Sequence, residues 1–156
     1  MIRAIAAIDD KRGIAAHGAI PWDIPQDKQY FREKTGHDTV LMGYKTYQEF
    51  DQPLPDRHNL VVSRHAYQVR PGFELVHSLE QLLQAPQDDI WVIGGAGLYE
   101  AALDYCDELY LTHITGDFQC DRYFPVYEEK FTLKSESTPQ TQNGYNFRFA
   151  VYTKNR

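Results

Sequence analysis

Short apolar runs alternate with helix-like segments over most of the chain, and this order constrains the fold more than any other feature. Runs of strand length stand at residues 2–8, 39–42, 59–63, 73–76, 89–93 and 109–114. Helices are expected between most of these runs, at residues 25–35, 43–50, 78–85 and 98–105. Parallel strands need crossover connections of this kind, usually helices. The order therefore predicts an α/β fold with a mostly parallel central sheet and helices on both faces.

The tail of the chain follows a different pattern. Residues 131–136 and 145–153 are strand-like and flank Asn143-Gly144, a dipeptide typical of tight turns. They predict an antiparallel hairpin with a wider loop at the edge of the sheet. In such sheets, ligands bind beyond the carboxyl ends of the strands, near a switch in strand order. Functional residues are therefore expected in the segments that follow strands.

Size and composition exclude several classes of protein. The length of 156 residues fits one domain, residues 1–156, whose core needs no disulfide or metal. Two cysteines make no disulfide framework, and the sequence contains no secretion signal and no apolar run of membrane-spanning length. We therefore expect a soluble, cytoplasmic protein without a membrane partner, and by default a monomer. The net charge of -6 argues against nucleic-acid binding, and no histidines stand at metal-ligand spacing.

Asp27 is the first candidate for chemistry. If Pro25 opens a helix, Asp27 lies in its first turn, where carboxylates are common because they favour the helix dipole. A purely structural role is therefore one interpretation. Tyr30 and Phe31 share its helix face and would bury the acid. Burial disfavours the charged form of a carboxyl, as is typical of groups that manage protons, so these neighbours favour a functional role.

Two junctions between a predicted strand and a predicted helix contain glycine. One is Ile93-Gly-Gly-Ala-Gly-Leu-Tyr99, and the other is Met42-Gly-Tyr-Lys-Thr46. Glycines at such places let the backbone approach a pyrophosphate. Each junction alone is equally well a plain tight turn, because neither matches the Rossmann or P-loop pattern. Together they favour a cofactor that contains a diphosphate.

The remaining candidates are arginines that could bind anions. Ser63-Arg64 directly follows a predicted strand, and its hydroxyl and guanidinium suit a phosphate monoester, although such a pair is often only solvated. Arg57, next to the proline-rich loop, is open to the same two interpretations. Cys106 is interpreted as a small core residue rather than a nucleophile.

Taken together, these segments resemble dihydrofolate reductase. The resemblance rests on Ala19-Ile-Pro-Trp-Asp-Ile-Pro-Gln-Asp27 followed by Phe31, and on further motifs in the order and spacing of the family. These motifs are residues 40–46, 53–57, 61–64, 93–99, 111–113 and 121–125. The resemblance covers residues 2–153, and it is carried by the ordered series rather than by any single motif.

The resemblance implies a three-layer fold and a transfer of hydride from NADPH to the pterin ring of dihydrofolate, which gives tetrahydrofolate. Asp27 would hold the pterin and promote protonation of the ring nitrogen beside the carbon that receives hydride. Thr112 would support Asp27, and Trp22 and Tyr99 complete the implied catalytic set. The implied ligands are dihydrofolate, with or without a polyglutamate tail, and antifolate inhibitors.

The resemblance also implies two sets of binding residues. Those for the substrate are Ile5, Ala7, Lys28, Phe31, Phe50, Arg57 and Ile93, with Arg57 on a carboxylate of the glutamate tail. Those for the cofactor are Ala7, Ile14, Ile20, Gly43, Tyr44, Lys45, Thr46, Ser63, Arg64, Gly94, Gly95, Ala96, Gly97, Leu98 and Tyr99. Ser63 and Arg64 would hold the 2′-phosphate, and the Gly94-Gly95 peptide is typically cis in the family.

The sequence departs from the family pattern at several of these positions. Tyr44 and Gly97 stand where cationic residues are common, which leaves Arg64 with more of the preference for NADPH. Lys28 replaces an apolar residue beside the benzoyl part of the substrate, so we expect it to alter antifolate affinity or to contact the glutamate tail. Ala15-Ala16 replaces a glycine of the mobile active-site loop, which predicts slower loop motion.

Two other functions compete with this interpretation. The riboflavin-pathway reductase, which reduces a phosphoribosyl aminopyrimidine with NADPH, would share the glycine junction. It should lack the series from Pro21-Trp22 to Asp27 and the Arg57 loop, both of which are present. An idle NADPH-binding module is the second competitor, and the intact Asp27 and Thr112 argue against it.

Overall fold

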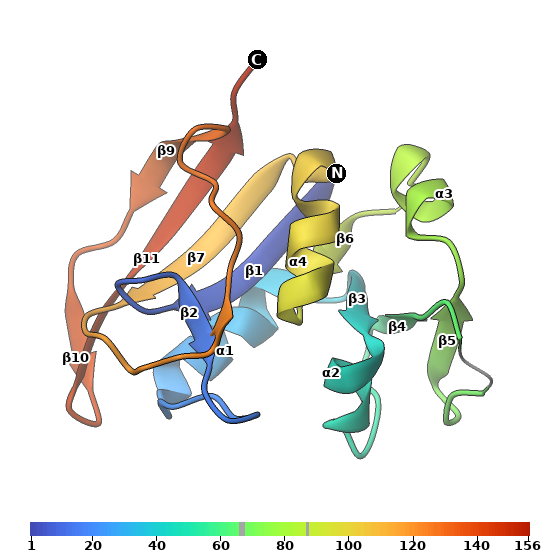
Figure 1. Ribbon diagram of the computed structural model, residues 1–156, viewed down its shortest axis with the longest axis horizontal. Helices are drawn as coiled ribbons and strands as arrows, with labels where there is room; N and C mark the ends of the chain where they lie inside the picture. Colours follow the sequence, from blue (N-terminus) through green and yellow to red (C-terminus); the bar gives the residue numbers. More distant parts are fainter. Residues whose placement is uncertain (66–67, 87) are drawn as a thin grey trace.

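The computed structural model describes residues 1–65, 68–86 and 88–156. Within these residues, nine strands form one sheet in the order β10-β11-β7-β1-β6-β3-β4-β5, with β9 also paired to β11 (Figure 1). The strands are β1 Ile2–Ile8, β3 Thr39–Gly43, β4 His58–Val62, β5 Phe73–Val76, β6 Ile90–Val92, β7 Glu108–Ile114, β9 Phe131–Glu136, β10 Gln140–Gln142 and β11 Tyr145–Lys154. Strands β1 and β3 to β7 are parallel, and β11 is antiparallel to β7. The expected mostly parallel sheet with an antiparallel edge is confirmed.

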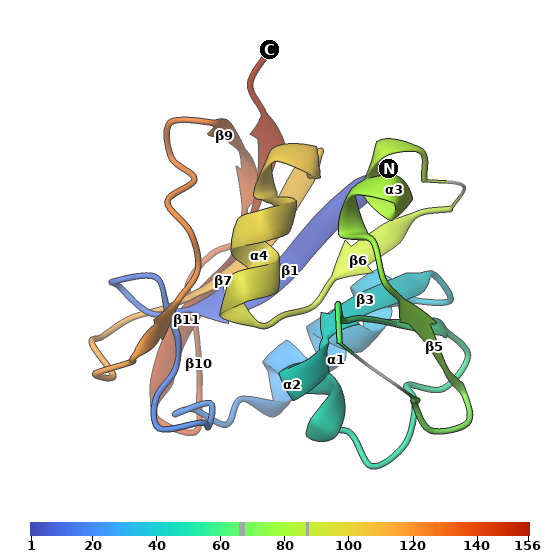
Figure 2. The same ribbon diagram turned by 45° about the vertical axis from the view of Figure 1, so that its right-hand side comes forward.

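Helices cover both faces of this sheet, as expected. They are α1 Pro25–Thr35, α2 Tyr44–Gln48, α3 Leu79–Gln84 and α4 Ala96–Ala102, the last followed by the 3-10 turn η1 Leu103–Tyr105. Figures 1 and 2 show α4 in front of β1 and α1 behind it. Side chains of a strand alternate between its faces, so Ala4 of β1 packs in the cluster of α4, whereas Ile5 packs with Phe31 of α1. None of the helices in the described ranges is long and apolar enough to cross a membrane.

Helix α1 begins and ends at the predicted residues. Pro25 is tolerated at its start because the first amides of a helix have no partner within it. At its end, Gly36 takes a positive φ of 50° and donates its N–H to the Arg32 carbonyl. In α3, Ser78 accepts a hydrogen bond from the Gln81 N–H at 3.2 Å, as a capping box predicts.

The structure refines the predicted tail. Asn143-Gly144, with φ of 54° and 81°, turns between β10 and β11. The expected wider loop therefore contains a strand, and β9 and β10 both pair with β11. The structure also contains a small second sheet that the sequence pattern did not predict, in which β2, Gly13–Ala15, pairs with β8, Arg122–Tyr123.

Candidate active site

Asp27 and Thr112 meet at the carboxyl end of the central strands. Thr112 lies near the end of β7, opposite Ala7 of β1, and its hydroxyl donates a hydrogen bond of 2.6 Å to Asp27 Oδ1. Burial raises the pKa of Asp27, and the bond from Thr112 acts in the opposite direction. The pair thus combines an acid that holds its proton above the usual range with a hydroxyl that fixes the orientation of its carboxyl group.

An aromatic and aliphatic wall lies beside this acid. Tyr30 stacks on Phe149 of β11, with ring centroids 4.0 Å apart, and burial raises the pKa of Tyr30 to about 12. The sequence pattern did not indicate Phe149 as a residue of this wall. The predicted lining residues are brought together, because one hydrophobic cluster contains Ile5, Phe31, Phe50 and Ile93. A flat ring placed beside Asp27 would therefore have an apolar environment on this side.

Tyr99 joins strand β1 to the glycine turn before α4. Its buried hydroxyl donates a hydrogen bond of 2.7 Å to the Ile5 carbonyl, and its pKa is raised mainly by burial. A Cβ atom added to Gly94, whose φ is 122°, would lie 3.4 Å from that hydroxyl. Trp22 is also buried, but in a different cluster, where it packs edge-on against Phe118 at 5.3 Å.

The two glycine junctions lie side by side. The Gly43 N–H donates a hydrogen bond of 2.8 Å to the Gly94 carbonyl, and the Gly94-Gly95 peptide is cis, as the family resemblance implied. A Cβ atom on Gly95 would come within 3.5 Å of Thr46 Oγ1. The two junctions therefore form a backbone cradle that suits a diphosphate, with the exposed Lys45 next to it.

Other predicted cofactor residues differ in accessibility. Gly97 is exposed, with open space around a Cβ atom, whereas Leu98 is buried in the core and could contribute only its backbone. Ala7, Ile14, Tyr44 and Ala96 are partly buried. Ile20 is 65% exposed on the segment between β2 and α1.

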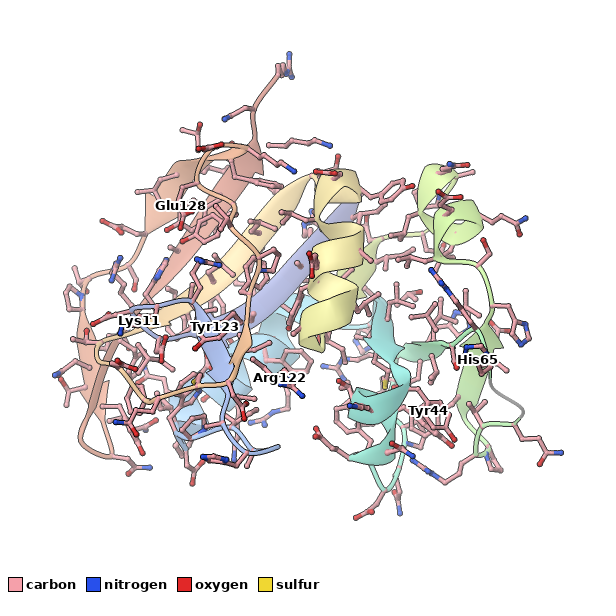
Figure 3. The ribbon with its side chains drawn as sticks, viewed as in Figure 1. Lys11, Tyr44, His65, Arg122, Tyr123 and Glu128 are labelled. Carbon is pink, nitrogen blue, oxygen red and sulfur yellow. The ribbon has the colours of Figure 1, made fainter. Side chains whose placement is uncertain are left out.

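The two arginines predicted to bind anions have different surroundings. Arg64 is exposed just after β4, where Ser63 Oγ accepts the N–H of His65 at 3.3 Å. Figure 3 shows Tyr44 and His65 on the same side of the molecule, on α2 and after β4. Arg57 is held by hydrogen bonds of 2.7–2.9 Å to Thr35 Oγ1 and to the carbonyls of Arg32 and Pro55.

The bonds that hold Arg57 leave part of its guanidinium available. A guanidinium has five N–H groups, and within the described residues three are used, one on each nitrogen. One N–H therefore remains on each terminal nitrogen, and a carboxylate can accept from such groups. The sequence pattern did not indicate Thr35, nor did it indicate Asn59, whose buried side chain makes hydrogen bonds to the backbone of Leu54 and Arg57. The sequence signal that could have indicated Asn59 was its polar side chain in a predicted strand rich in valine.

Lys28 is turned away from the buried acid. Its Nζ lies 2.9 Å from Asp23 Oδ1, and both side chains are about two thirds exposed. It is therefore a surface residue on the first turn of α1, next to Asp27 in the chain. In the described part of the chain, no group of three or more His, Cys, Asp and Glu side chains is placed to hold a metal ion. Cys106 is fully buried, in agreement with its interpretation as a core residue.

Comparisons with known proteins converge on one family. The family model described as dihydrofolate reductase matches residues 1–154. The dihydrofolate reductase of Bacillus subtilis is 35% identical over 159 residues, which cover 99% of this chain and 95% of the relative. That of Buchnera aphidicola is 33% identical, with 98% and 99% covered. The structure of dihydrofolate reductase from Enterococcus faecalis complexed with NADP(H) and RAB-propyl has a TM-score of 0.90 and 28% identity, covering 100% of this chain and 97% of its own.

Proposed function

Because the chain belongs to the dihydrofolate reductase family and catalyses NADPH-dependent reduction of dihydrofolate to tetrahydrofolate, we propose that Asp27 is the acid of this reaction. The observation that supports this role is the 2.6 Å hydrogen bond from Thr112 to a partly buried carboxyl whose pKa is raised. The direct test is NADPH oxidation by the purified protein with dihydrofolate, compared between Asp27 and its asparagine variant.

The proposed roles of the chain follow from this acid. Asp27 holds the amino group and ring nitrogen of the pterin, and it promotes protonation of the ring nitrogen beside the reacting carbon. Thr112 keeps the carboxyl group oriented, and Tyr99 and Trp22 fix the walls around it. The bound cofactor supplies the hydride. Holding two flat rings in contact while water is excluded accounts for much of the rate of such reactions.

The cofactor is proposed to lie across the glycine cradle. Gly43, Lys45, Thr46, Gly94, Gly95, Ala96, Gly97 and the backbone of Leu98 would hold the diphosphate, with Tyr44 at the cradle's side. Ala7, Ile14, Ile20 and Tyr99 would place the nicotinamide, and Ser63 with Arg64 would bind the 2′-phosphate. The hydrogen bond from the Gly43 N–H to the Gly94 carbonyl supports this fit, because it holds the two glycine junctions next to each other.

The preference for NADPH is expected to depend on Arg64. Arg64→Leu should raise the KM for NADPH about tenfold or more, because a charge-assisted hydrogen bond contributes about 1.5–3 kcal/mol and about 1.4 kcal/mol is a factor of ten. The KM for NADH, which has no 2′-phosphate, should stay the same. Steady-state assays with both cofactors make the comparison. Equal changes for the two cofactors would contradict the assignment.

The substrate is proposed to lie between Ile5, Ala7, Phe31, Phe50 and Ile93, with its glutamate tail on Arg57. Lys28, a surface residue next to Asp27 in the chain, would act on a longer, polyglutamate tail. Lys28→Leu should weaken binding of triglutamyl dihydrofolate several-fold more than binding of the monoglutamate, since each added carboxylate brings charge near this lysine. Equilibrium binding of the two substrates and of an antifolate tests this role. Lys130→Leu is the control, because Lys130 is also an exposed lysine that pairs with a carboxylate, that of Asp104. Unchanged affinities for all three ligands would show that Lys28 is not one of the substrate-binding residues.

Several broader properties are also proposals. We propose a single domain over residues 1–156, a monomer and a cytoplasmic location, and sedimentation of the purified protein tests the second of these. The family match favours dihydrofolate over the phosphoribosyl aminopyrimidine of the riboflavin pathway. Turnover in the NADPH assay distinguishes an enzyme from an idle binding module.

A further inference from the structure

Asp9 is a buried carboxylate at the point where β1 leaves the sheet, and the roles proposed above do not use it. It is 3% exposed. Its Oδ1 accepts the backbone N–H groups of Lys11 at 2.9 Å and Gly13 at 2.7 Å. Its Oδ2 accepts the N–H of Phe118 at 3.1 Å, from a segment more than a hundred residues away. One side chain therefore joins two distant segments of backbone.

The first of these segments is a tight turn of residues 9–13, which we call the Asp9 turn. The Asp9 N–H donates to the Gly13 carbonyl at 3.0 Å, and the Arg12 N–H donates to the Asp9 carbonyl at 3.0 Å. Arg12 has a φ of 63°, a conformation that costs free energy in a residue other than glycine. The two bonds to Asp9 Oδ1 help to hold this turn closed, and strand β2 with Ile14 follows directly.

The second segment, residues 116–124, lies along the Asp9 turn. Asp10 donates its N–H to the Gly116 carbonyl at 3.0 Å, and its Oδ2 accepts the Gly116 N–H at 2.9 Å. Strands β2 and β8 continue the pairing, and Figure 3 shows Lys11 of the turn and Tyr123 of β8 on the same side of the molecule. Unlike the exposed Asp10, Asp9 makes its contact within the protein interior.

Gly13 and Cys120 show how closely the two segments pack around Asp9. A Cβ atom on Gly13 would lie 2.5 Å from Cys120 Cβ and 2.8 Å from Asp9 Oδ2, distances that no side chain can occupy. Burial raises the pKa of the Cys120 thiol to about 11, and the neighbouring Asp9 acts in the same direction. The thiol therefore stays protonated beside this carboxylate.

We propose that Asp9 is a positioning residue for hydride transfer, which sets the place of Ile14 against the nicotinamide by tying the Asp9 turn to Phe118. This inference rests on the function proposed above. Asp9 touches neither substrate nor cofactor, and it acts through Gly13 and Ile14. Displacement of a positioning group by about 1 Å can lower a reaction rate about 100-fold. Contacts that fix the position of Ile14 can therefore control the rate of hydride transfer.

The test is Asp9→Asn, which keeps the size of the side chain but replaces one acceptor oxygen with an NH2 group. That group must face the N–H of Phe118 or the donors of the turn, so one side of the tie opens. The rate of hydride transfer, measured in a single turnover with NADPH and with 4-deuterated NADPH, should fall by about tenfold. The isotope effect on kcat should rise, because hydride transfer then limits turnover, and the KM for dihydrofolate should change little.

Asp107→Asn is the matched control, because Asp107 Oδ2 also accepts a backbone N–H, that of Ile2 at 2.8 Å, at the other end of β1. It should lose stability in urea without changing the hydride-transfer rate. If Asp9→Asn loses stability while its single-turnover rate and isotope effect match the wild type, Asp9 is only structural and the proposal is overturned. A wild-type protein that does not turn over dihydrofolate would instead contradict the proposed function.

Gly13→Ala gives a second, independent test should the asparagine variant fail to fold. The added methyl group must push Cys120 or Asp9 aside, so it loosens the same tie without removing a charge. The proposal expects the same slower hydride transfer and larger isotope effect. A folded Gly13→Ala protein with wild-type single-turnover kinetics would overturn it.

Discussion

Replacement of Asp27 by asparagine is expected to lower kcat/KM for dihydrofolate about 10³-fold near neutral pH, the scale of a lost general acid. The amide keeps the shape of the side chain and can still accept the hydrogen bond from Thr112, but it has no proton to manage. The affinity for NADPH should be unchanged, because the glycine cradle is built from other segments. Asp23→Asn, which alters an exposed carboxylate near the same pocket, is the matched control.

The pH dependence of kcat/KM in the wild type and in Asp27→Asn checks whether the loss of activity is due to the proton held by Asp27. Burial raises the pKa of Asp27, so the protonated acid persists to a higher pH than it would in water, and activity should decline as pH rises through that pKa. The asparagine variant should lose this limb of the profile. Steady-state kcat/KM measured from mildly acidic to alkaline pH gives both curves. Parallel curves for the two proteins would show that another group controls the proton.

The raised pKa also has a stability consequence, whose sign is fixed by linkage. A group with a folded pKa above its unfolded value contributes stability that is fully present below the unfolded pKa and is lost as pH rises through the folded pKa. The ordinary pKa of Asp27 is 3.8, and burial raises it. The loss of folding stability caused by burying this carboxyl group is therefore complete at neutral and alkaline pH. Asp27→Asn should accordingly be more resistant to urea than the wild type at neutral pH, and the difference should shrink in acid.

Replacement of Arg57 by lysine is expected to raise the KM for dihydrofolate about 10- to 100-fold with little change in kcat, because a charge-assisted pair contributes about 1.5–3 kcal/mol to binding. Lysine keeps the charge, but it cannot bond Thr35 and two carbonyls while also presenting a planar fork. The loss should therefore appear in ground-state binding of the tail, far from the reacting carbon.

The matched control for Arg57 is Arg32→Lys, on the exposed side of α1. Its carbonyl accepts a bond from Arg57, but its side chain does not take part in that bond, so KM should hold near the wild-type value. A truncated substrate without the glutamate tail offers a further comparison, because it should be reduced equally by the Arg57→Lys and wild-type proteins. A wild-type KM for dihydrofolate in Arg57→Lys would show that the tail binds elsewhere.

The sequence predicted some features well because their causes are local. Pro25 and Gly36 mark the two ends of α1, and alternating side chains place Ala4 and Ile5 of β1 on opposite faces. The contact between Asp27 and Thr112 spans 85 residues, so no spacing along the chain predicts it, and only the family resemblance implied it. Strands β2 and β8 were missed because such short segments form only through mutual pairing. The ion pair between Lys28 and Asp23 depends on side-chain rotamers, which a sequence pattern does not specify.

The central position of β1 in the sheet has a consequence for how the chain folds during translation. Ile2 pairs with Ile90 of β6, and Ile8 pairs with His113 of β7. Strand β1 therefore leaves the ribosome long before β6 and β7 are translated, and its apolar residues have no sheet to join in the meantime. Long-range pairings of this kind form slowly, since a long loop of chain must close first. We expect the nascent chain to be a client for chaperones until β7 emerges, and the active site to assemble in the same late step.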